Sequence, residues 1–448
     1  MRFFTSNLKS LLAATVCLTA ATTASAASPW ELSLSLKAVD AVYVTSKGTV
    51  LAADNDFMYP ETSGIYYSDD EGETWTQASV GQWLYNYFFE AGDYVFALGE
   101  SGRLARSEDD GHTWTVLNYT RYVEDYIDAK EEDELVAYSA SYDPEKQRIY
   151  LPVWSSTVGV IYSDDFGVTW SFTDRESLLL RFEDGTTVFD NFYSSTFFNG
   201  QLQVYGIYRI FIYDAENDTW DCMRNKDGYE VNTNFLAVTK VHDGILYASR
   251  GMEDDDEDMP FIMYTPDMVN WGAVASRPAT IVTNYVRAIN HDGEYLYAAT
   301  INRGIFRTKD LGQTWESVGE GLPIHKQYPE ILADRTVQLA FSENYLFAAQ
   351  HDYFNSTSGV YRVRRGDDMG EEVNSIAEIF GEPVSVTVSD SEISAPGAAA
   401  ISVCAVTGVE VLGTSGSTLS TASLPTGVYV YVVTTSNGSQ TTGKFIKR

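Results

Sequence analysis

An octapeptide of the form S/T-x-D-x-G-x-T-W recurs along the chain. Its four clear copies are SDDEGETW (68–75), SEDDGHTW (107–114), SDDFGVTW (163–170) and TKDLGQTW (308–315). Two degenerate copies, YDAENDTW and TPDMVNW, end at Trp220 and Trp271. The six tryptophans, from Trp75 to Trp315, therefore recur every 48 residues on average, since (315 − 75)/5 = 48. A period in this range predicts propeller blades or a solenoid.

The segments between the copies favour β-structure. YVFALGESGRLARS and YLYAATINRGIFRT are pairs of short aromatic and β-branched runs joined by Gly, Ser or Asn turns, without a helical period. Each unit is predicted to run strand, strand, strand, octapeptide, strand. Residues 233–249 and 283–299 match closely once one residue is inserted, which indicates one unit copied along the chain.

The two ends of the repeat array are incomplete. After Trp315 a further partial unit, 337–365, lacks the octapeptide, while PWELSLSL (29–36) resembles a strand that follows one, with Trp30 in the tryptophan position. We expect this N-terminal strand to complete the last blade, which would close the ring and remove two exposed sheet edges. The predicted fold class is all-β, a seven-bladed β-propeller.

The octapeptides are expected to be structural. Their Ser or Thr and Asp can accept hydrogen bonds from the turn backbone, the Gly takes a positive φ, and the Trp packs into the sheet. Repeated carboxylates in equivalent turns cannot converge on one substrate. The pattern resembles the Asp-box, or bacterial-neuraminidase, repeat of sialidases and other secreted propellers, which implies a position on the face away from the active site. The structural residues are Asp70, Trp75, Asp109, Trp114, Asp165, Trp170, Asp310 and Trp315.

The N-terminal segment has the composition of an export signal. Residues 1–26 run from Arg2 and Lys9 through an apolar stretch to ASA, the order of a secretory signal peptide, and the apolar stretch is too short to span a bilayer. We expect a mature chain from about Ala27 without a transmembrane span. Its net charge would be 28 − 63 = −35, which argues against nucleic acid and anionic membranes as partners.

The last part of the chain has a different amino-acid composition. A polar linker (367–383) precedes alternating Val-, Ser-, Thr- and Gly-rich runs, which predict a small Ig-like β-sandwich over 384–448, behind a propeller over 27–366. The ending LPTGVYVYVVTTSNGSQTTGKFIKR resembles the C-terminal sorting domain of the type IX secretion system in the Bacteroidetes, although GEPVSV replaces the usual Asn-Pro at its start. The resemblance implies that the type IX secretion machinery is a partner of the chain. It also implies that the protein is secreted or held on the outer cell surface, which it would reach by way of the periplasm.

Ligand-binding residues are expected at the channel mouth opposite the Asp-boxes. Four blades lead into their inner strand with Asn followed by an aromatic residue, an arrangement that suits hydroxylated ligands and equally suits hydrogen bonds to the loop's own backbone. The candidates are Asn86, Trp154, Asn191, Tyr208, Arg209, Asn234, Arg250, Asn284, Arg303 and Tyr353.

Candidates for catalysis and metal binding are less specific. Two of Asp54, Asp56, Glu100 and Asp352 would serve a glycoside hydrolase if they faced each other about 5–9.5 Å apart. Arg209, Arg250 and Arg303 could supply the three cations of a sialidase, but the Arg-Ile-Pro tripeptide is missing. No cofactor is required; calcium is the candidate ion, and its candidate ligands are Asp254, Asp255, Asp256 and Asp258.

Three functions remain in view. We expect a non-catalytic binding module for a glycan or an extracellular protein, because an aromatic excess at loop ends accompanies no recognisable acid/base constellation. A sialidase-like glycoside hydrolase is the alternative. A protein-assembly factor is a third hypothesis, which no residue selects.

Overall fold

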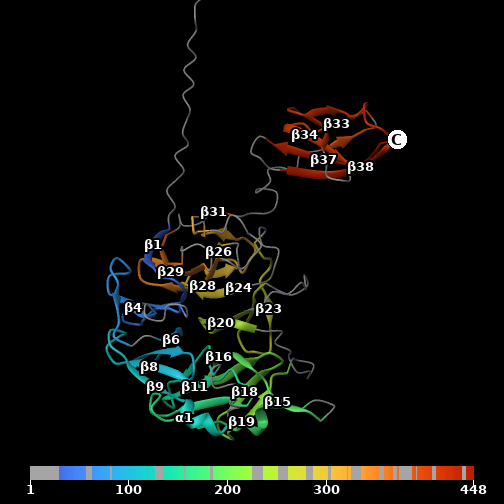
Figure 1. Ribbon diagram of the computed structural model, residues 1–448. Coiled ribbons are helices and arrows are strands. Elements are labelled where there is room, and N and C mark those ends of the chain that lie inside the picture. Colours follow the sequence, from blue (N-terminus) through green and yellow to red (C-terminus); the bar gives the residue numbers. More distant parts are fainter. Residues whose placement is uncertain are drawn as a thin grey trace, which may run out of the picture.

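Seven antiparallel sheets are arranged around one axis (Figure 1). The structure is a computed structural model, and it describes residues 30–56, 63–80, 83–126, 135–155, 157–181, 185–224, 236–250, 261–278, 286–300, 304–319, 321–323, 334–352, 358–366, 371–372, 386–389, 391–405, 410–435 and 440–447. Consecutive sheets follow one another in sequence order. The predicted all-β propeller is confirmed.

Each blade runs outward from an innermost strand, and neighbouring inner strands contact one another around the axis. The strands of blades one to four are β2 (Val39–Val44), β3 (Val50–Asp54), β4 (Gly64–Ser68) and β5 (Thr76–Gln77); β6 (Tyr85–Ala91), β7 (Tyr94–Gly99), β8 (Arg103–Ser107) and β9 (Thr115–Asn118); β10 (Ser141–Asp143), β11 (Arg148–Pro152), β12 (Val160–Ser163) and β13 (Ser171–Phe172); β16 (Phe192–Phe198), β17 (Gln201–Gly206), β18 (Ile210–Asp214) and β19 (Thr219–Cys222). Those of blades five to seven are β20 (Leu236–His242), β21 (Ile245–Arg250), β22 (Met263–Thr265) and β23 (Gly272–Ala273); β24 (Val286–His291), β25 (Leu296–Thr300), β26 (Gly304–Thr308) and β27 (Glu316–Ser317); β28 (Asp334–Phe341), β29 (Tyr345–Asp352), β30 (Gly359–Arg364) and β1 (Glu31–Ser35).

Short elements decorate the connections between blades. They are α1 (Thr120–Val123), η1 (Glu124–Tyr126), η2 (Glu176–Leu178) and the hairpin of β14 (Leu179–Arg181) with β15 (Thr187–Phe189). Among the described residues, no helix is long and apolar enough to cross a membrane.

The N-terminal strand closes the ring, as predicted. β1 pairs antiparallel with β30, so the last blade contains strands from both ends of the propeller. Trp30, just before β1, is buried and donates its indole N–H to the Val318 carbonyl of blade six at 2.6 Å. The buried Arg362 guanidinium on β30 adds an ion pair to Glu31, with Nε and Oε1 2.6 Å apart. The closure therefore joins β1 both to its own blade and to the preceding blade.

Every clear Asp-box makes the same hydrogen bonds. In the second box the Ser107 hydroxyl donates to Asp109 at 2.8 Å and accepts from the Gly111 N–H at 2.8 Å. Asp109 also accepts from the backbone N–H and the hydroxyl of Thr113, at 2.8 and 2.6 Å. Burial alone would raise the pKa of Asp109, but these hydrogen bonds hold it below its ordinary value. The boxes ending at Trp75, Trp170 and Trp315 repeat the pattern.

The glycines of the four clear boxes, and some of the box tryptophans, contact the preceding blade. Gly111 has φ +94°, and a Cβ added there would lie 2.5 Å from Leu51 Cδ2 of blade one. In the same way, Gly167 lies against Leu104 of blade two. Trp315 donates its indole N–H to the Ser276 carbonyl of the preceding blade at 3.0 Å. The boxes thus act as joints between blades.

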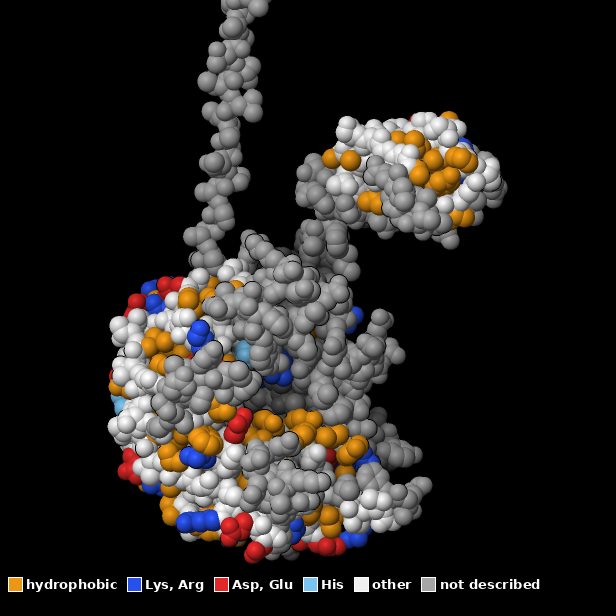
Figure 2. All heavy atoms as spheres, in the orientation of Figure 1, with side chains coloured by type: hydrophobic (Ala, Val, Ile, Leu, Met, Phe, Trp, Pro, Cys, Tyr) orange, Lys and Arg blue, Asp and Glu red, His pale blue; other side chains and the backbone are white. Residues whose placement is uncertain are grey.

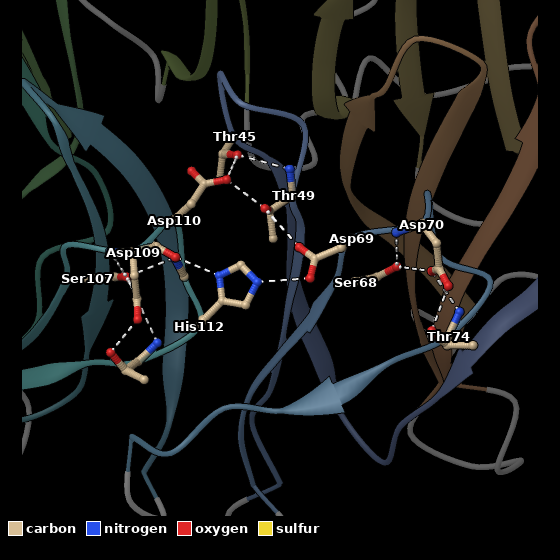
Figure 3. A network of polar contacts seen from close by, with 12 residues as sticks. Thr45, Thr49, Ser68, Asp69, Asp70, Thr74, Ser107, Asp109, Asp110 and His112 are labelled. Carbon is tan, nitrogen blue, oxygen red and sulfur yellow. Dashed lines mark hydrogen bonds and ion pairs between the residues drawn. The ribbon is translucent and has the colours of Figure 1, made fainter.

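Non-consensus box positions strengthen the joint between blades one and two (Figure 3). Asp110 accepts hydrogen bonds from the hydroxyls of Thr45 and Thr49 at 2.9 and 2.6 Å. His112 bridges the two boxes, because its ring nitrogens contact the Asp109 carbonyl at 2.6 Å and the Asp69 carboxylate at 2.9 Å. The hydrogen bond to Asp69 is the main reason that the pKa of His112 is raised.

The C-terminal residues form a β-sandwich. Its two sheets have the strand orders β32-β33-β36 and β35-β34-β37-β38. The strand bounds are β32 (Thr387–Val388), β33 (Glu392–Ser394), β34 (Ala398–Ala405), β35 (Glu410–Thr414), β36 (Thr418–Ser420), β37 (Gly427–Thr435) and β38 (Gln440–Lys447). One buried cluster takes residues from both sheets, among them Ile393 and Val403. Within the predicted linker, β31 (Glu371–Glu372) pairs with β27 of blade six.

Truncating Trp30 tests the closure. Trp30→Ala should lower the free energy of unfolding of the propeller by about 3–5 kcal/mol, because it removes a buried indole and its hydrogen bond to blade six. Leu32→Ala is the matched control on the same strand: Leu32 is 50% exposed, so the loss should stay below about 1 kcal/mol. Denaturant unfolding followed by tryptophan fluorescence measures both, and equal losses would contradict the closure.

Two glycine substitutions can separate the effect of packing against the neighbouring blade from the effect of backbone strain. Gly111 and Gly48 both have positive φ, +94° and +100°, but nothing lies within 4 Å of a Cβ at Gly48. Gly111→Ala should therefore destabilise the protein by about 1–3 kcal/mol more than Gly48→Ala, because only the former pushes against Leu51. The midpoints of thermal unfolding of the two variants measure the difference. If the two midpoints coincide, the glycine serves the turn alone.

Candidate functional site

The inner strands share an irregularity that shapes the channel. Near the start of six of them, one residue is inserted relative to the second strand of the blade, which makes a β-bulge. The inserted residues are Asp40, Asn86, Tyr193, Ala237, Arg287 and Val337. Because the extra residue of a bulge leaves the regular pairing, its side chain can be re-aimed.

The bulges lie around a pocket on the ring axis. The pocket has a volume of about 480 Å³, and residues from the inner strands or inner-strand approaches of all seven blades line it; the centre of the ring is hollowed in Figure 2. Five of the six bulge residues are part of its lining; the side chain of Ala237 lies outside the description. The lining also includes Asn55 and Glu100, which follow second strands. The pocket is therefore at the end of the channel opposite the Asp-boxes, which follow third strands.

The two Asn-aromatic pairs that the structure describes take different positions. Asn86 is itself a bulge residue and lines the pocket. Asn191 precedes the bulge at Tyr193 by two residues, and its backbone carbonyl accepts a hydrogen bond from the Ile207 N–H. The same sequence pattern thus meets the bulge differently in blades two and four.

One corner of the pocket is acidic. Asp40 receives a hydrogen bond from the Asn55 amide at 2.5 Å and contacts Nδ1 of the buried His351 at 2.9 Å. Strands β2 and β29 and the residue after β3 therefore hold the Asp40 side chain in place.

Glu100 lies in the same pocket, but its carboxylate has no described side chain hydrogen-bonded to it, as that of Asp40 has. Its backbone is fixed by hydrogen bonds with Leu84, Arg103 and the Trp83 indole. Its carboxylate makes no hydrogen bond or ion pair with any residue that the structure describes. Burial, and then the charge of Asp40, raise the pKa of Glu100 above its ordinary value. The acidic corner therefore contains one carboxylate that is held by partners and one that is not.

Aromatic side chains form the wall contributed by blades three and four. Tyr138 and Tyr193 line the pocket. Trp154 packs behind them, with ring centroids 4.5 Å from Tyr193 and 6.0 Å from Tyr138. Tyr138 is 45% exposed, so its ring is available to a ligand. Such a wall suits the apolar faces of sugars and also cationic groups.

The proposed acid/base residues do not gather in the pocket. Glu100 lines it, whereas Asp54 and Asp56 do not. Asp54 is buried at the end of β3, where its carboxylate accepts the Ala38 N–H at 2.9 Å and burial raises its pKa. The backbone carbonyl of Asp56 accepts the Ser63 hydroxyl at 2.9 Å. Asp352 pairs with Asp334 through the backbone, and its side chain lies outside the description.

Two candidates of blade four, Tyr208 and Arg209, belong to a loop that is held by hydrogen bonds to Asp190. The buried carboxylate of Asp190 accepts the backbone N–H groups of Ile207, Tyr208 and Arg209 at 2.7, 2.9 and 2.9 Å. This places Tyr208, 47% exposed, and Arg209 outside the pocket lining. Asp190 is therefore a structural residue, and no motif in the sequence marked it in advance.

Several sequence-based candidates cannot be placed. Arg250 ends β21, but only its backbone is described. The remaining ones fall outside the described residues: Asn234, Asn284, Arg303 and Tyr353, and the proposed calcium ligands Asp254, Asp255, Asp256 and Asp258. Among the described residues, no group of three or more His, Cys, Asp or Glu side chains is arranged to hold a metal ion.

Comparison with protein families finds the octapeptides. The model described as BNR/Asp-box repeat matches residues 66–77 and 161–172. Both segments contain one of the boxes whose hydrogen bonds are given above. No curated protein matches the chain.

Solved structures resemble the chain in fold. A GH74 xyloglucanase from Xanthomonas campestris superposes with a TM-score of 0.50 at 15% identity, over 76% of this chain and 54% of its own, so the chain spans about half of that enzyme. YCF48 from Cyanidioschyzon merolae gives 0.47 at 13% identity, over 76% and 99% of the two chains. The extracellular domain of a hybrid two component system from B. thetaiotaomicron gives 0.47 at 12% identity, over 93% and 57%. The seven four-stranded blades, the family match and the likeness to the xyloglucanase identify a β-propeller that carries BNR/Asp-box repeats.

Proposed function

We propose that this protein is a non-catalytic binding module that takes a glycan or an extracellular protein at its channel mouth. The observation that carries the proposal is the pocket of about 480 Å³ on the ring axis, to which all seven blades contribute. Its size is that of ordinary ligand sites, and its lining combines amides and hydroxyls with tyrosines. Binding groups of these kinds converge nowhere else among the residues discussed above.

The arrangement of the carboxylates supports binding rather than hydrolysis. Of the three acid/base candidates whose side chains the structure describes, Asp54, Asp56 and Glu100, only Glu100 lines the pocket. Asp54 is committed to a backbone hydrogen bond at the end of its strand. A two-carboxylate mechanism needs a second carboxyl free to act as nucleophile or base.

A glycoside hydrolase remains the second candidate, and one observation favours it. Asp40 shares the pocket with Glu100, whose pKa is raised, as that of a general acid would be. Asp40 is however held by Asn55 and His351, which suits a fixed electrostatic role better than a nucleophile. Product analysis decides between the two functions.

We further propose export through the C-terminal sandwich. The support is the resemblance of residues 384–448 to type IX sorting domains, together with the signal-peptide pattern of residues 1–26. The mature protein would then be secreted or held on the outer cell surface by way of the periplasm. No cofactor is needed for binding, and calcium at residues 254–258 stays a prediction that the binding assay tests with and without the ion.

An array experiment tests the binding function. The mature chain should bind at least one member of an array of glycans and extracellular polypeptides. Prolonged incubation of the protein with that ligand should yield no cleavage product. Tyr138→Ala should weaken binding about tenfold, because it removes an exposed ring from the pocket wall. Cleavage of the bound ligand would instead show that the protein is a hydrolase.

The matched control is another exposed tyrosine. Tyr208→Ala removes a ring that is 47% exposed, close to the 45% of Tyr138, but lies outside the pocket lining. It should leave the affinity within about twofold of the unmodified chain. Equal losses in the two variants would show that the ligand does not use the pocket.

A further inference from the structure

The pocket has an imbalance of charge at its acidic corner. Asp40 and Glu100 are the carboxylates of its lining, and they lie close enough for the charge of Asp40 to act on Glu100. Arg287 is the one basic residue in the described lining. It makes an interaction of its own and forms no ion pair with either carboxylate among the pairs that the structure describes. The Glu100 carboxylate therefore has no ion-pair partner among the described residues.

The position of Asp40 is built into the fold. As the inserted residue of the β2 bulge it leaves the regular pairing, and Asn55 and His351 fix its carboxylate from two other strands. Asn55 donates its amide N–H to Asp40, which orients the amide, and its carbonyl oxygen is buried with no hydrogen-bond partner among the described residues. Asn86, the next bulge residue, likewise has a buried side-chain oxygen without a described partner. This side of the pocket is thus rich in acceptors.

Two further features favour a cation. Tyr87, Tyr138 and Tyr193 line the same pocket, and the faces of aromatic rings attract cations. The whole chain has a net charge of −33, whose long-range field draws cationic ligands toward it and repels anionic ones. A neutral ligand would gain nothing from the net charge of the chain.

We propose that the acidic corner of the pocket recognises a protonated amine or guanidinium group on the ligand, with Glu100 as its ion-pair partner and the bulge residues as the specificity-determining positions. The inference rests on the proposed binding function and narrows its ligand class. The cation can belong to a lysine or arginine side chain of a polypeptide or to an amino sugar, and the two sources share this chemistry.

The test compares charged probes with neutral counterparts. Isothermal titration calorimetry of the mature chain at neutral pH would use a short peptide with one central lysine against the same peptide with acetyl-lysine. A glucosamine oligomer against the N-acetylated oligomer forms the second arm. At least one charged probe should bind about tenfold or more tightly than its neutral counterpart, and the arm in which this occurs identifies the source.

Substitution of Glu100 provides the decisive variant. Glu100→Gln keeps the shape of the side chain and removes its charge, so the charged and neutral probes should then bind within about twofold of each other. Glu343→Gln is the matched control, because Glu343 is exposed in the turn between β28 and β29, on the Asp-box face. It should leave the preference for the charged probe unchanged.

The pH dependence has a definite sign. Ionised Glu100 attracts the probe and its protonated form does not, so affinity for the lysine peptide should rise with pH through the raised pKa of Glu100. The other charged or titratable groups described in this region are Asp40, Asp54, Asp56, His351, Arg287 and the lining residues Tyr87, Tyr138 and Tyr193, and the Glu100→Gln variant retains all of them. The rise should therefore be smaller in that variant.

Three results would overturn the inference: equal binding of charged and neutral probes, a charge preference that survives Glu100→Gln, or no binding of either charged probe. The proposed function has its own readout, the loss of array binding in Tyr138→Ala. If that loss is seen while the charge preference is absent, the pocket binds a ligand but does not select a cation.

Discussion

The pairing of β1 with β30 is the constraint on which the rest of the propeller depends. A ring of blades has no natural end, and without this strand the last sheet would expose an edge beside the first blade. Trp30 ties the same strand to blade six, so the closure involves two blades at once. The channel pocket exists because the ring closes, since residues from all seven blades line it.

The two faces of the ring have different tasks. On one face the polar atoms of the Asp-boxes form hydrogen bonds within their own turns, as those of Asp109 do. The boxes also pack against the preceding blade, as Gly111 does. Their repetition follows from the repetition of that joint. On the other face the bulges release one residue in each of six inner strands, and these residues differ from blade to blade: Asp40 is acidic, Asn86 is an amide and Tyr193 is aromatic. Repetition indicates scaffold here, and variation at a fixed structural position indicates recognition.

The fold could be predicted because its signals are local and repeated: the boxes, their spacing, and the box-like Trp30 ahead of an orphan strand. The pocket could not. Asp40, Tyr193 and Arg287 line it because a bulge re-aims them, and a bulge changes register without leaving a residue type as its mark. Among the candidates from the sequence whose side chains are described, Asn86 and Glu100 line the pocket, because Asn86 occupies a bulge and Glu100 directly follows a second strand. A signal was present in the matching segments 233–249 and 283–299, where Ala237 and Arg287 take equivalent places and differ in chemistry.

Hydrogen exchange of the mature chain with and without a bound array hit tests the central claim most directly, namely that the channel mouth is the binding face and the Asp-box face is scaffold. Protection is predicted at the starts of the inner strands, around Asp40, Asn86, Tyr193 and Arg287. No change is predicted in the box turns at 68–75 and 107–114. Protection concentrated in the box turns or in the C-terminal sandwich, with the inner strands unchanged, would contradict the account.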